Sequence, residues 1–208
     1  MPNWCYTDIN FYGSEKNISD FFNRVNEYTS KNFRATDFGT NWLGNILCGF
    51  DLGDRIDTTE NKLRCRGSLE FISGLDIEDE NAASFSITTS TAWGPMIKMW
   101  HAIIEKHYAN RIEMHWIAEE QGSLLYLTDD KSRYEDRYWA DCEFPDDISA
   151  PWTYYFSTTK DTVDFINSNF KNVSLSTSTD FETTQTFEEG NKRIVVIPLT
   201  DASLDEID

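Results

Sequence analysis

Hydrophobic and polar residues alternate along the first segment of the chain, from Trp4 to Tyr12. One side of this segment carries Cys5, Thr7, Ile9 and Phe11, and the other carries Trp4, Tyr6, Asp8 and Asn10. Side chains of a strand point alternately to its two faces, so the pattern predicts a strand with one dry face. After Gly13-Ser14 the apolar residues recur at helical spacing, at Ile18, Phe21, Phe22, Val25 and Tyr28. This spacing predicts an amphipathic helix of about four turns, with Ser14 at its cap.

The segment 32–67 is rich in Gly, Asn and Asp and has no clean period, which predicts an irregular insertion with Trp42 and Phe50 folded back onto the core. Two strands are expected next, at 67–73 and 84–90, joined by an acidic turn over 76–81. A second helix follows, its apolar positions being Met96, Met99, Trp100, Ile103, Ile104 and His107. Two more strands are expected, at 111–119 and 124–128.

The order strand, helix, two strands, helix, strand is that of a ferredoxin-like α+β sandwich, here with one extra strand. We therefore expect a ferredoxin-like domain over residues 1–130, an antiparallel sheet with two helices on one face. Pro95 suits the first position of the second helix, because its missing N–H would be unpaired there anyway. Trp93, just before it, is expected to be a wedge that plugs the end of the sandwich, and a binding-site residue only as the second interpretation.

The remainder of the chain, 134–200, predicts a smaller β-rich α+β extension. Strands are expected at 137–144, 152–157, 173–179, 181–187 and 193–199. A short helix is expected over 160–170, preceded by a Ser/Thr cap and burying Val163, Ile166 and Phe170. The last segment, 201–208, is an acidic tail.

Composition restricts the class of protein. Hydrophobic residues make up 39% of the chain and aromatic residues 14%, which is typical of a folded globular protein. The chain has no run of apolar residues long enough to cross a membrane, and its first residues lack the pattern of a secretory leader. Its four cysteines are scattered, without a CxxC pair. These features predict a cytoplasmic protein with reduced, packed thiols.

Charge is the most unusual bulk property, because 18 basic residues stand against 36 acidic ones and give a formal charge of -18. Direct binding to nucleic acid is not expected, since phosphate contacts require clustered Lys and Arg. A cationic partner is expected instead, because a concentrated negative field accelerates association with the opposite sign.

Few residues are candidates for catalysis or metal binding. Cys5 has no basic neighbour in the first 15 residues to lower its pKa, so we interpret it as a packing residue and not a nucleophile. His101, Glu105 and His115 do not show the spacing of a zinc site, and Asp76 to Glu80 lacks the glycine of a calcium loop. No phosphate-binding loop or catalytic motif is present, so no metal, cofactor or catalytic residue is predicted.

The most acidic stretch runs from Glu113 to Asp147 and holds 11 acidic residues against 3 basic ones. Aromatic residues are interleaved with the carboxylates, a combination that suits binding because rings supply contact energy while carboxylates steer the partner. The predicted partner-binding residues are Glu113, Trp116, Glu119, Glu120, Asp129, Asp130, Glu135, Asp136, Trp139, Asp141 and Glu143. The alternative interpretation is that these turns are simply solvated and keep the protein soluble.

Three motifs suggest a family: "MPNWC" at the start, "FGTNWLGNILCGFD" in the middle and "TTSTAWGP" before the second helix. Over residues 1–130 the chain resembles the YubB ferredoxin-like family of plasmid, prophage and phage proteins. The resemblance implies a ferredoxin-like fold and a mobile-element origin, and it implies no catalytic residues. The chain departs from the pattern in having Gly94 before a single proline and a long acidic extension.

Three functional hypotheses follow. The first is a non-enzymatic acidic protein that occupies the basic surface of a host nucleic-acid-binding or defence protein, in the manner of a DNA mimic. The second is a small enzyme with a site near Trp42, Trp93 and His101. The third is a structural component of a virion. The sequence leaves the oligomeric state open.

Overall fold

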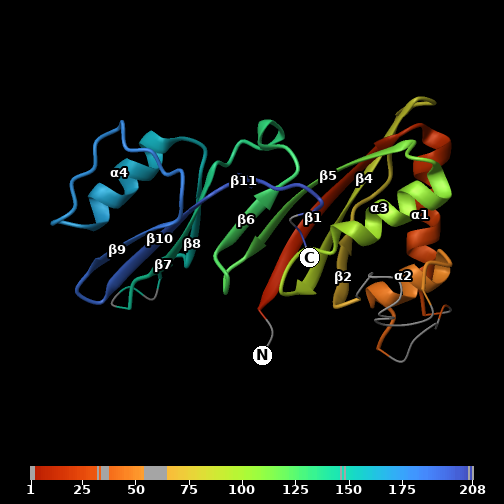
Figure 1. The fold of residues 1–208 in the computed structure, drawn as a ribbon, viewed down its shortest axis with the longest axis horizontal. Helices are drawn as coiled ribbons and strands as arrows, with labels where there is room; N and C mark the ends of the chain where they lie inside the picture. Colours follow the sequence, from red (N-terminus) through yellow and green to blue (C-terminus); the bar gives the residue numbers. More distant parts are fainter. Residues whose placement is uncertain are drawn as a thin grey trace. The chain divides into compact units, whose positions relative to one another are not determined.

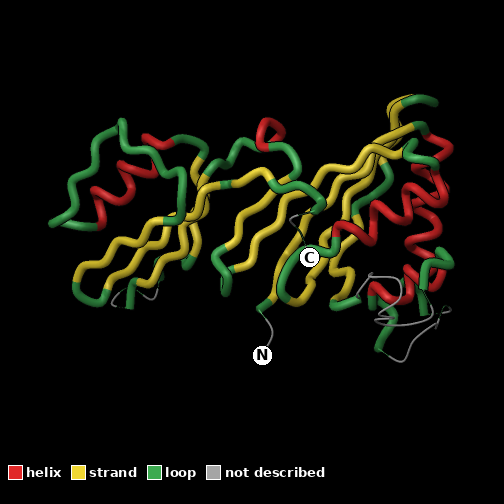
Figure 2. Tube along the Cα trace, in the orientation of Figure 1, coloured by secondary structure: helices red, strands yellow, loops and turns green. Residues whose placement is uncertain are grey.

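The computed structural model describes residues 3–31, 33, 38–53, 65–145, 147, 149–205 and 207. These residues form four α-helices, a seven-stranded mixed sheet and, toward the C-terminus, a separate four-stranded antiparallel sheet (Figure 1; Figure 2). The protein is therefore of the α+β class, as predicted. The chain divides into two compact units, which we call unit 1 (residues 1–120 and 202–208) and unit 2 (residues 121–201).

Unit 1 is built around a central strand. Its elements, in chain order, are β1 (Trp4–Gly13), α1 (Glu15–Tyr28), α2 (Leu43–Gly49), β2 (Gly67–Ile72), β3 (Asp76–Asp79), β4 (Ala82–Ala92), α3 (Ile97–Tyr108) and β5 (Ile112–Glu120). The strands lie in the order β5–β1–β4–β2, and every neighbouring pair in this order is antiparallel. Register places Ile9 of β1 opposite Trp116 of β5 and Ile87 of β4. The alternation read from Trp4 to Tyr12 thus predicts the central strand correctly.

An aromatic cluster joins the helices to one face of this sheet. The ring of Phe11 on β1 lies 4.9 Å from that of Phe21 on α1 and 5.7 Å from that of Trp100 on α3. Phe85 on β4 completes the cluster at 5.0 Å from Phe11. Both α1 and α3 therefore cover the same face of the sheet (Figure 1). The opposite side chains of β1 are mostly exposed.

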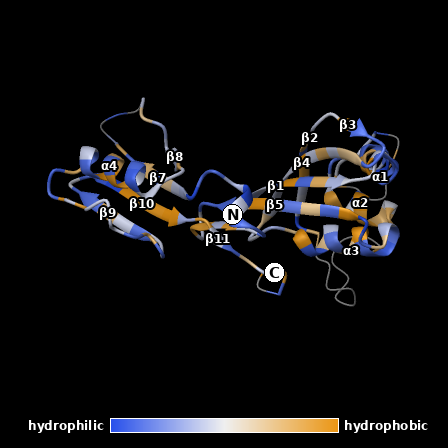
Figure 3. Ribbon diagram, turned by 90° about the horizontal axis from the view of Figure 1, so that it is seen from above, coloured by the Kyte–Doolittle hydropathy of each residue, from blue (hydrophilic) through white to orange (hydrophobic). Residues whose placement is uncertain are grey.

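Unit 2 has its own core. Its elements are β6 (Leu125–Thr128), a 3-10 turn at Lys131–Arg133, β7 (Tyr138–Glu143), β8 (Thr153–Phe156), α4 (Thr159–Asn169), β9 (Gln185–Glu189), β10 (Lys192–Pro198) and β11 (Thr200–Asp201). The antiparallel sheet has the order β8–β7–β10–β9, and β11 pairs in parallel with β6. Strand β10 is buried on both faces, which its hydrophobic colour in Figure 3 reflects.

The helix of unit 2 begins where the sequence predicts. Thr158 stands at the N-cap of α4, and its hydroxyl oxygen accepts a hydrogen bond from the Asp161 N–H at 3.1 Å. Val163 and Ile166 of the helix are buried in one cluster with Ala140 of β7 and Ile194 of β10. The predicted strand–helix order at the start of this extension is therefore confirmed.

Several predicted elements of unit 1 are wrong. The acidic segment expected to be a turn forms β3 over Asp76–Asp79, and only Glu80-Asn81 turns the chain. Asp79 closes this hairpin, since its Oδ1 accepts hydrogen bonds from the N–H groups of Asn81 and Ala82 at 2.7 and 3.0 Å. The insertion at 32–67 contains the helix α2, which the sequence pattern does not predict. Phe50 is buried as expected, and residues 54–64 lie outside the described residues.

The strands expected at 173–179 and 181–187 are not formed as such, because only Gln185–Glu189 is a strand. The side chain of Asn167 on α4 takes the place of a strand partner. Its Nδ2 donates to the Leu175 carbonyl at 3.0 Å, and its Oδ1 accepts from the Leu175 N–H at 2.9 Å. No helix among the described residues is long and apolar enough to cross a membrane.

Candidate functional site

The acidic stretch from Glu113 to Asp147 does not form a single surface within either unit. Glu113, Glu119 and Glu120 belong to β5 of unit 1, and the other acidic residues of the stretch belong to unit 2, with Asp146 outside the described residues. The acidic residues that are close together in the sequence are therefore divided between the two units, and each group is described separately.

Strand alternation separates the predicted residues of β5. Glu113 and Glu119 lie on the side away from the helices, whereas Trp116 and Glu120 lie on the buried side. Trp116 is opposite Ile9 of β1, which faces the aromatic cluster, and its side chain is fully buried. Trp116 and Glu120 were expected to touch a partner, but neither is accessible in the structure.

The same correction applies to two residues of β7. Trp139 is buried and its ring lies 6.3 Å from that of Tyr126 on β6. Asp141 is also buried, and its Oδ1 accepts a hydrogen bond from Nε2 of Gln121 at 2.6 Å. Neither side chain is accessible to a partner, because β7 is a central strand that is covered at these positions.

The remaining predicted carboxylates of unit 2, at Asp129, Asp130, Glu135, Asp136 and Glu143, are exposed or half-buried. Several of them are engaged locally. Asp130 accepts hydrogen bonds from Ser132 and lies 3.6 Å from Nε of Arg133, and Glu143 lies 3.2 Å from an Arg193 guanidinium nitrogen. Local pairing of this kind favours the interpretation that these residues are solvated turn and edge carboxylates.

Unit 1 presents a more coherent surface on the side of its sheet away from the helices. We call this surface the open face; its members are Trp4, Tyr6, Asp8, Asn10 and Tyr12 of β1, Ser84, Ser86 and Thr88 of β4, and Glu113, His115, Ile117 and Glu119 of β5. None of these described residues is a lysine or an arginine. On β1 and β5 the open face thus combines three aromatic rings with three carboxylates.

Hydrogen bonds hold several of these side chains in place. The Thr88 hydroxyl donates to Oδ1 of Asp8 at 2.6 Å, across the pair β1–β4. Nε2 of His115 lies 2.6 Å from Oε1 of Glu113, and the His115 ring is 6.1 Å from that of Tyr12. Fixed side chains lose little conformational entropy when a partner binds, so the open face is preorganised for contact.

A hollow of about 630 Å³ lies at the Tyr12 end of the open face. Its lining is about equally polar and apolar, and among the described residues that line it Arg111 is the one basic side chain; the others include Glu78, Asn81, Asn110 and Glu113. The hollow has room for a side chain or a small polar molecule, but its mixed charge does not select one.

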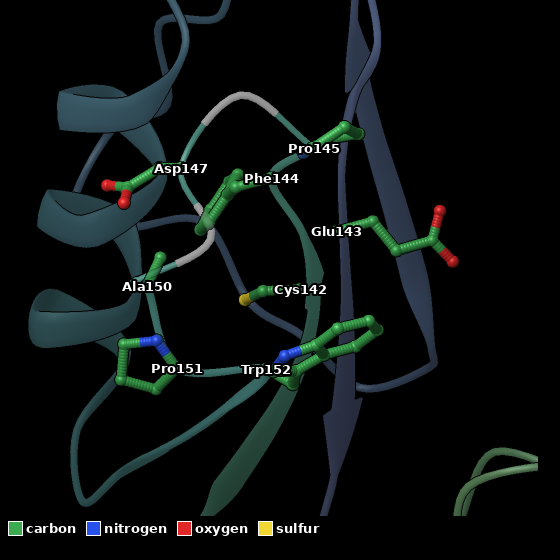
Figure 4. A pocket seen from close by; sticks show the side chains of 8 residues that line it. All are labelled: Cys142, Glu143, Phe144, Pro145, Asp147, Ala150, Pro151 and Trp152. Carbon is green, nitrogen blue, oxygen red and sulfur yellow. The ribbon is translucent and has the colours of Figure 1, made fainter.

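A second hollow, of about 390 Å³, lies in unit 2 beside the loop from β7 to β8 (Figure 4). Its lining is mainly apolar, with Phe144, Pro151 and Trp152 around the buried Cys142. Figure 4 shows the carboxylate of Glu143 pointing away from the other lining side chains, and this carboxylate is paired with Arg193. This hollow therefore offers an apolar surface without a directed reactive group.

Trp93 does not plug the sandwich. Its side chain is 60% exposed, and its backbone has a left-handed φ of 63°. The helix α3 begins at Ile97 with Met96 as its N-cap, so Pro95 lies before the helix and not at its first position. The prediction of a structural wedge is therefore wrong, and the position returns as a candidate binding residue.

The residues of the enzyme hypothesis line neither of the two hollows described above. Trp42 is half-buried and stacks on Phe38 with ring centres 5.3 Å apart, and His101 is a half-buried residue of α3. Neither residue lines either of the two hollows above, nor does Trp93. Among the residues that the structure describes, no group of three or more His, Cys, Asp or Glu side chains is arranged to hold a metal ion.

Cys5, Cys65 and Cys142 are buried, as expected for Cys5, and Cys48 is half-buried. Burial is the largest cause that raises the pKa of Cys5 to about 12, and burial likewise raises the pKa of Cys142 to about 12. A thiol with so high a pKa remains protonated at neutral pH and is a poor nucleophile.

No protein-family model, curated protein or solved structure matches the chain. The resemblance to the YubB family therefore stays a prediction.

Proposed function

We propose that the protein acts by binding, without catalysis, and that the open face of unit 1 engages a cationic surface of another protein. One observation carries the proposal: an exposed sheet face with aromatic rings and carboxylates and with no lysine or arginine at its described positions. Aromatic side chains supply most of the contact energy at such interfaces, while carboxylates set the charge preference and the association rate.

The partner class that suits this surface is a nucleic-acid-binding protein. Duplex DNA carries about one negative charge per 1.7 Å of axis, so a protein that binds it must present a contiguous basic surface. An acidic protein with a formal charge of -18 competes for that surface by charge complementarity. A host protein of this kind is consistent with the mobile-element origin that the family resemblance implies.

We further propose that unit 1 is a ferredoxin-like sandwich. Support comes from the element order together with the antiparallel strand order β5–β1–β4–β2 and the two helices on one face. A sandwich of this type leaves one sheet face uncovered, which explains why an exposed aromatic surface exists in a folded domain. Fold alone does not specify a function, so the proposal depends on the open face itself.

The test uses a fluorescently labelled, capped oligoarginine peptide as the cationic probe and fluorescence anisotropy as the readout. The variant Asp8→Asn/Glu113→Gln/Glu119→Gln removes three charges from the open face. The matched control Asp164→Asn/Asp180→Asn/Glu182→Gln removes three exposed charges from unit 2. We expect the first variant to bind the peptide about tenfold more weakly and the control to bind like the original protein, because each exposed charge contact contributes about 0.2–1 kcal/mol.

Salt provides a second readout. Raising ionic strength from about 0.01 M to about 0.15 M shortens the Debye length from about 30 Å to about 8 Å and should weaken the complex steeply. Equal weakening by the two triple variants would show that net charge, and not the open face, attracts the peptide. Absence of binding at low salt would refute the proposed function.

A further inference from the structure

The corner between β4 and α3 holds an exposed tryptophan in an unfavourable backbone conformation. Trp93 has a φ of 63° and is 60% exposed. Bulky residues rarely adopt the left-handed region, because the Cβ atom approaches the following carbonyl oxygen. Glycine or asparagine is the usual residue at such a position, so the tryptophan is not there for its backbone preference.

Neighbouring residues fix the corner without using the indole ring. The Trp93 N–H donates to the Asn3 carbonyl at 2.8 Å, and the Thr91 hydroxyl donates to the Gly94 carbonyl at 2.7 Å. The Ala92 N–H donates to the Arg66 carbonyl at 2.9 Å. These bonds involve only the backbone at Trp93, and they would survive replacement of its side chain. Strain that the surrounding structure imposes on an exposed residue indicates a functional role for the side chain.

Two further exposed rings belong to the same end of unit 1. Trp4, which is 47% exposed, is opposite Ala92 in the β1–β4 pair, one residue before Trp93. Tyr6 is 52% exposed and lies opposite Glu119 of β5. Within the corner Gly94 and Pro95 are buried, so its exposed surface comes from the Trp93 side chain. This end of the open face therefore offers aromatic surface next to a carboxylate.

We propose that Trp4 of the open face and Trp93, which directly follows β4 at the end of this face, form an aromatic anchor and receive an arginine side chain of the cationic partner. This inference rests on the proposed function. A guanidinium group stacks on an indole within about 6 Å of the ring centre and keeps its N–H donors free for a carboxylate. Glu119 is the acidic residue of the open face at this end, and the hydrogen bonds to its carboxylate would be charge-assisted.

Charge decides between this occupant and an apolar one. The open face carries Asp8, Glu113 and Glu119 and no lysine or arginine among its described members. Arg66, whose carbonyl accepts a hydrogen bond from the Ala92 N–H next to the corner, is half-buried with its Nε buried, and the three carboxylates of the open face stand against it. A cationic side chain that also stacks on rings satisfies both features of the surface, which an aliphatic side chain does not.

The test compares Trp93→Gly and Trp93→Asn with the original protein in two measurements. The first is the melting temperature: both variants accept a left-handed φ, so we expect no decrease. The second is the affinity for capped oligoarginine and oligolysine peptides of equal length: we expect about a tenfold loss for oligoarginine and a smaller loss for oligolysine. Trp152→Gly, which removes an exposed tryptophan from unit 2, is the matched control and should change neither affinity.

Each other outcome overturns the inference. A marked decrease of the melting temperature in both variants would show that Trp93 is a structural wedge after all. Unchanged oligoarginine binding in folded variants would refute the anchor while leaving the proposed function intact, whereas failure of the original protein to bind either peptide would refute both. A dimer that Trp93→Gly dissociates would identify a second copy of the chain as the occupant.

Discussion

Replacing Phe11 by alanine tests the core on which the open face depends. The Phe11 side chain is fully buried in the aromatic cluster, with ring centres of Phe21, Phe85 and Trp100 at 4.9, 5.0 and 5.7 Å. It joins the central strand to both α1 and α3. Loss of this ring leaves a cavity bounded by three elements that cannot all move inward together.

The expected magnitude follows from these contacts. Truncating a buried phenylalanine to alanine costs about 3–5 kcal/mol, through lost transfer free energy and the cavity that remains. Each aromatic pair adds about 0.5–1.5 kcal/mol beyond its buried area. Since Phe11 has three ring partners and no exposed edge, we expect a loss of about 4 kcal/mol. A domain is stable by only about 5–15 kcal/mol, so this is a large fraction.

Urea unfolding followed by tryptophan fluorescence and circular dichroism measures the loss. Phe71→Ala is the matched control, because Phe71 is a strand residue of the same unit but is 59% exposed. Its replacement should change the free energy of unfolding by less than about 0.5 kcal/mol. A loss below about 1 kcal/mol for Phe11→Ala, or equal losses for the two variants, would refute the assignment of the aromatic cluster as the core of unit 1.

Two further predictions concern a helix cap and a buried hydroxyl. Thr158→Ala should cost about 1 kcal/mol in thermal or urea unfolding because the Asp161 N–H loses its acceptor, whereas Ser14→Ala should cost less because the Ser14 side chain makes no cap hydrogen bond. Burial and the hydrogen bond to Asp20 raise the pKa of Tyr108, so the unfolded chain loses this proton before the folded protein does. The free energy of unfolding should therefore fall as pH rises above about 10, the unfolded pKa of tyrosine, and Tyr108→Phe should reduce that dependence; an equal decrease in the variant would contradict it.

Elements with one buried and one exposed face were predictable from sequence because burial itself produces the period. Helix α2 was not, since Gly44 and Gly49 are poor helix formers in a segment rich in glycine and asparagine. The structure explains both glycines by close approach. A Cβ atom at Gly44 would lie 2.7 Å from Nε1 of Trp42, and one at Gly49 would lie 2.3 Å from the Tyr28 ring. These glycines lower the helix propensity of the segment, and the close packing that requires them is seen only in the folded structure.

The strands that were predicted wrongly have a related cause. Residues 173–179 alternate as a strand does, but the backbone of Leu175 finds its donor and acceptor in the Asn167 side chain and not in a neighbouring strand. Asp76–Asp79 is poor in β-forming residues, yet it pairs with β4 because the two segments are joined by a tight hairpin. In both segments the structure depends on which group forms hydrogen bonds with the backbone. The local sequence pattern does not show that group.

The number of acidic residues in a stretch of sequence does not show which of them share a surface, whereas the two-residue period of a strand does. The acidic stretch predicted Glu113, Trp116, Glu119 and Glu120 as one group, but the side chains of a strand alternate between its faces. Glu113 and Glu119 therefore share the open face, whereas Trp116 and Glu120 point to the buried side. The same alternation assigns Tyr6 of β1 to the open face, and the register of β1 with β5 puts it opposite Glu119. The period of two residues within each strand is thus the signal that assigns a side chain to this surface. The neighbouring strands that complete the surface are far away in the sequence.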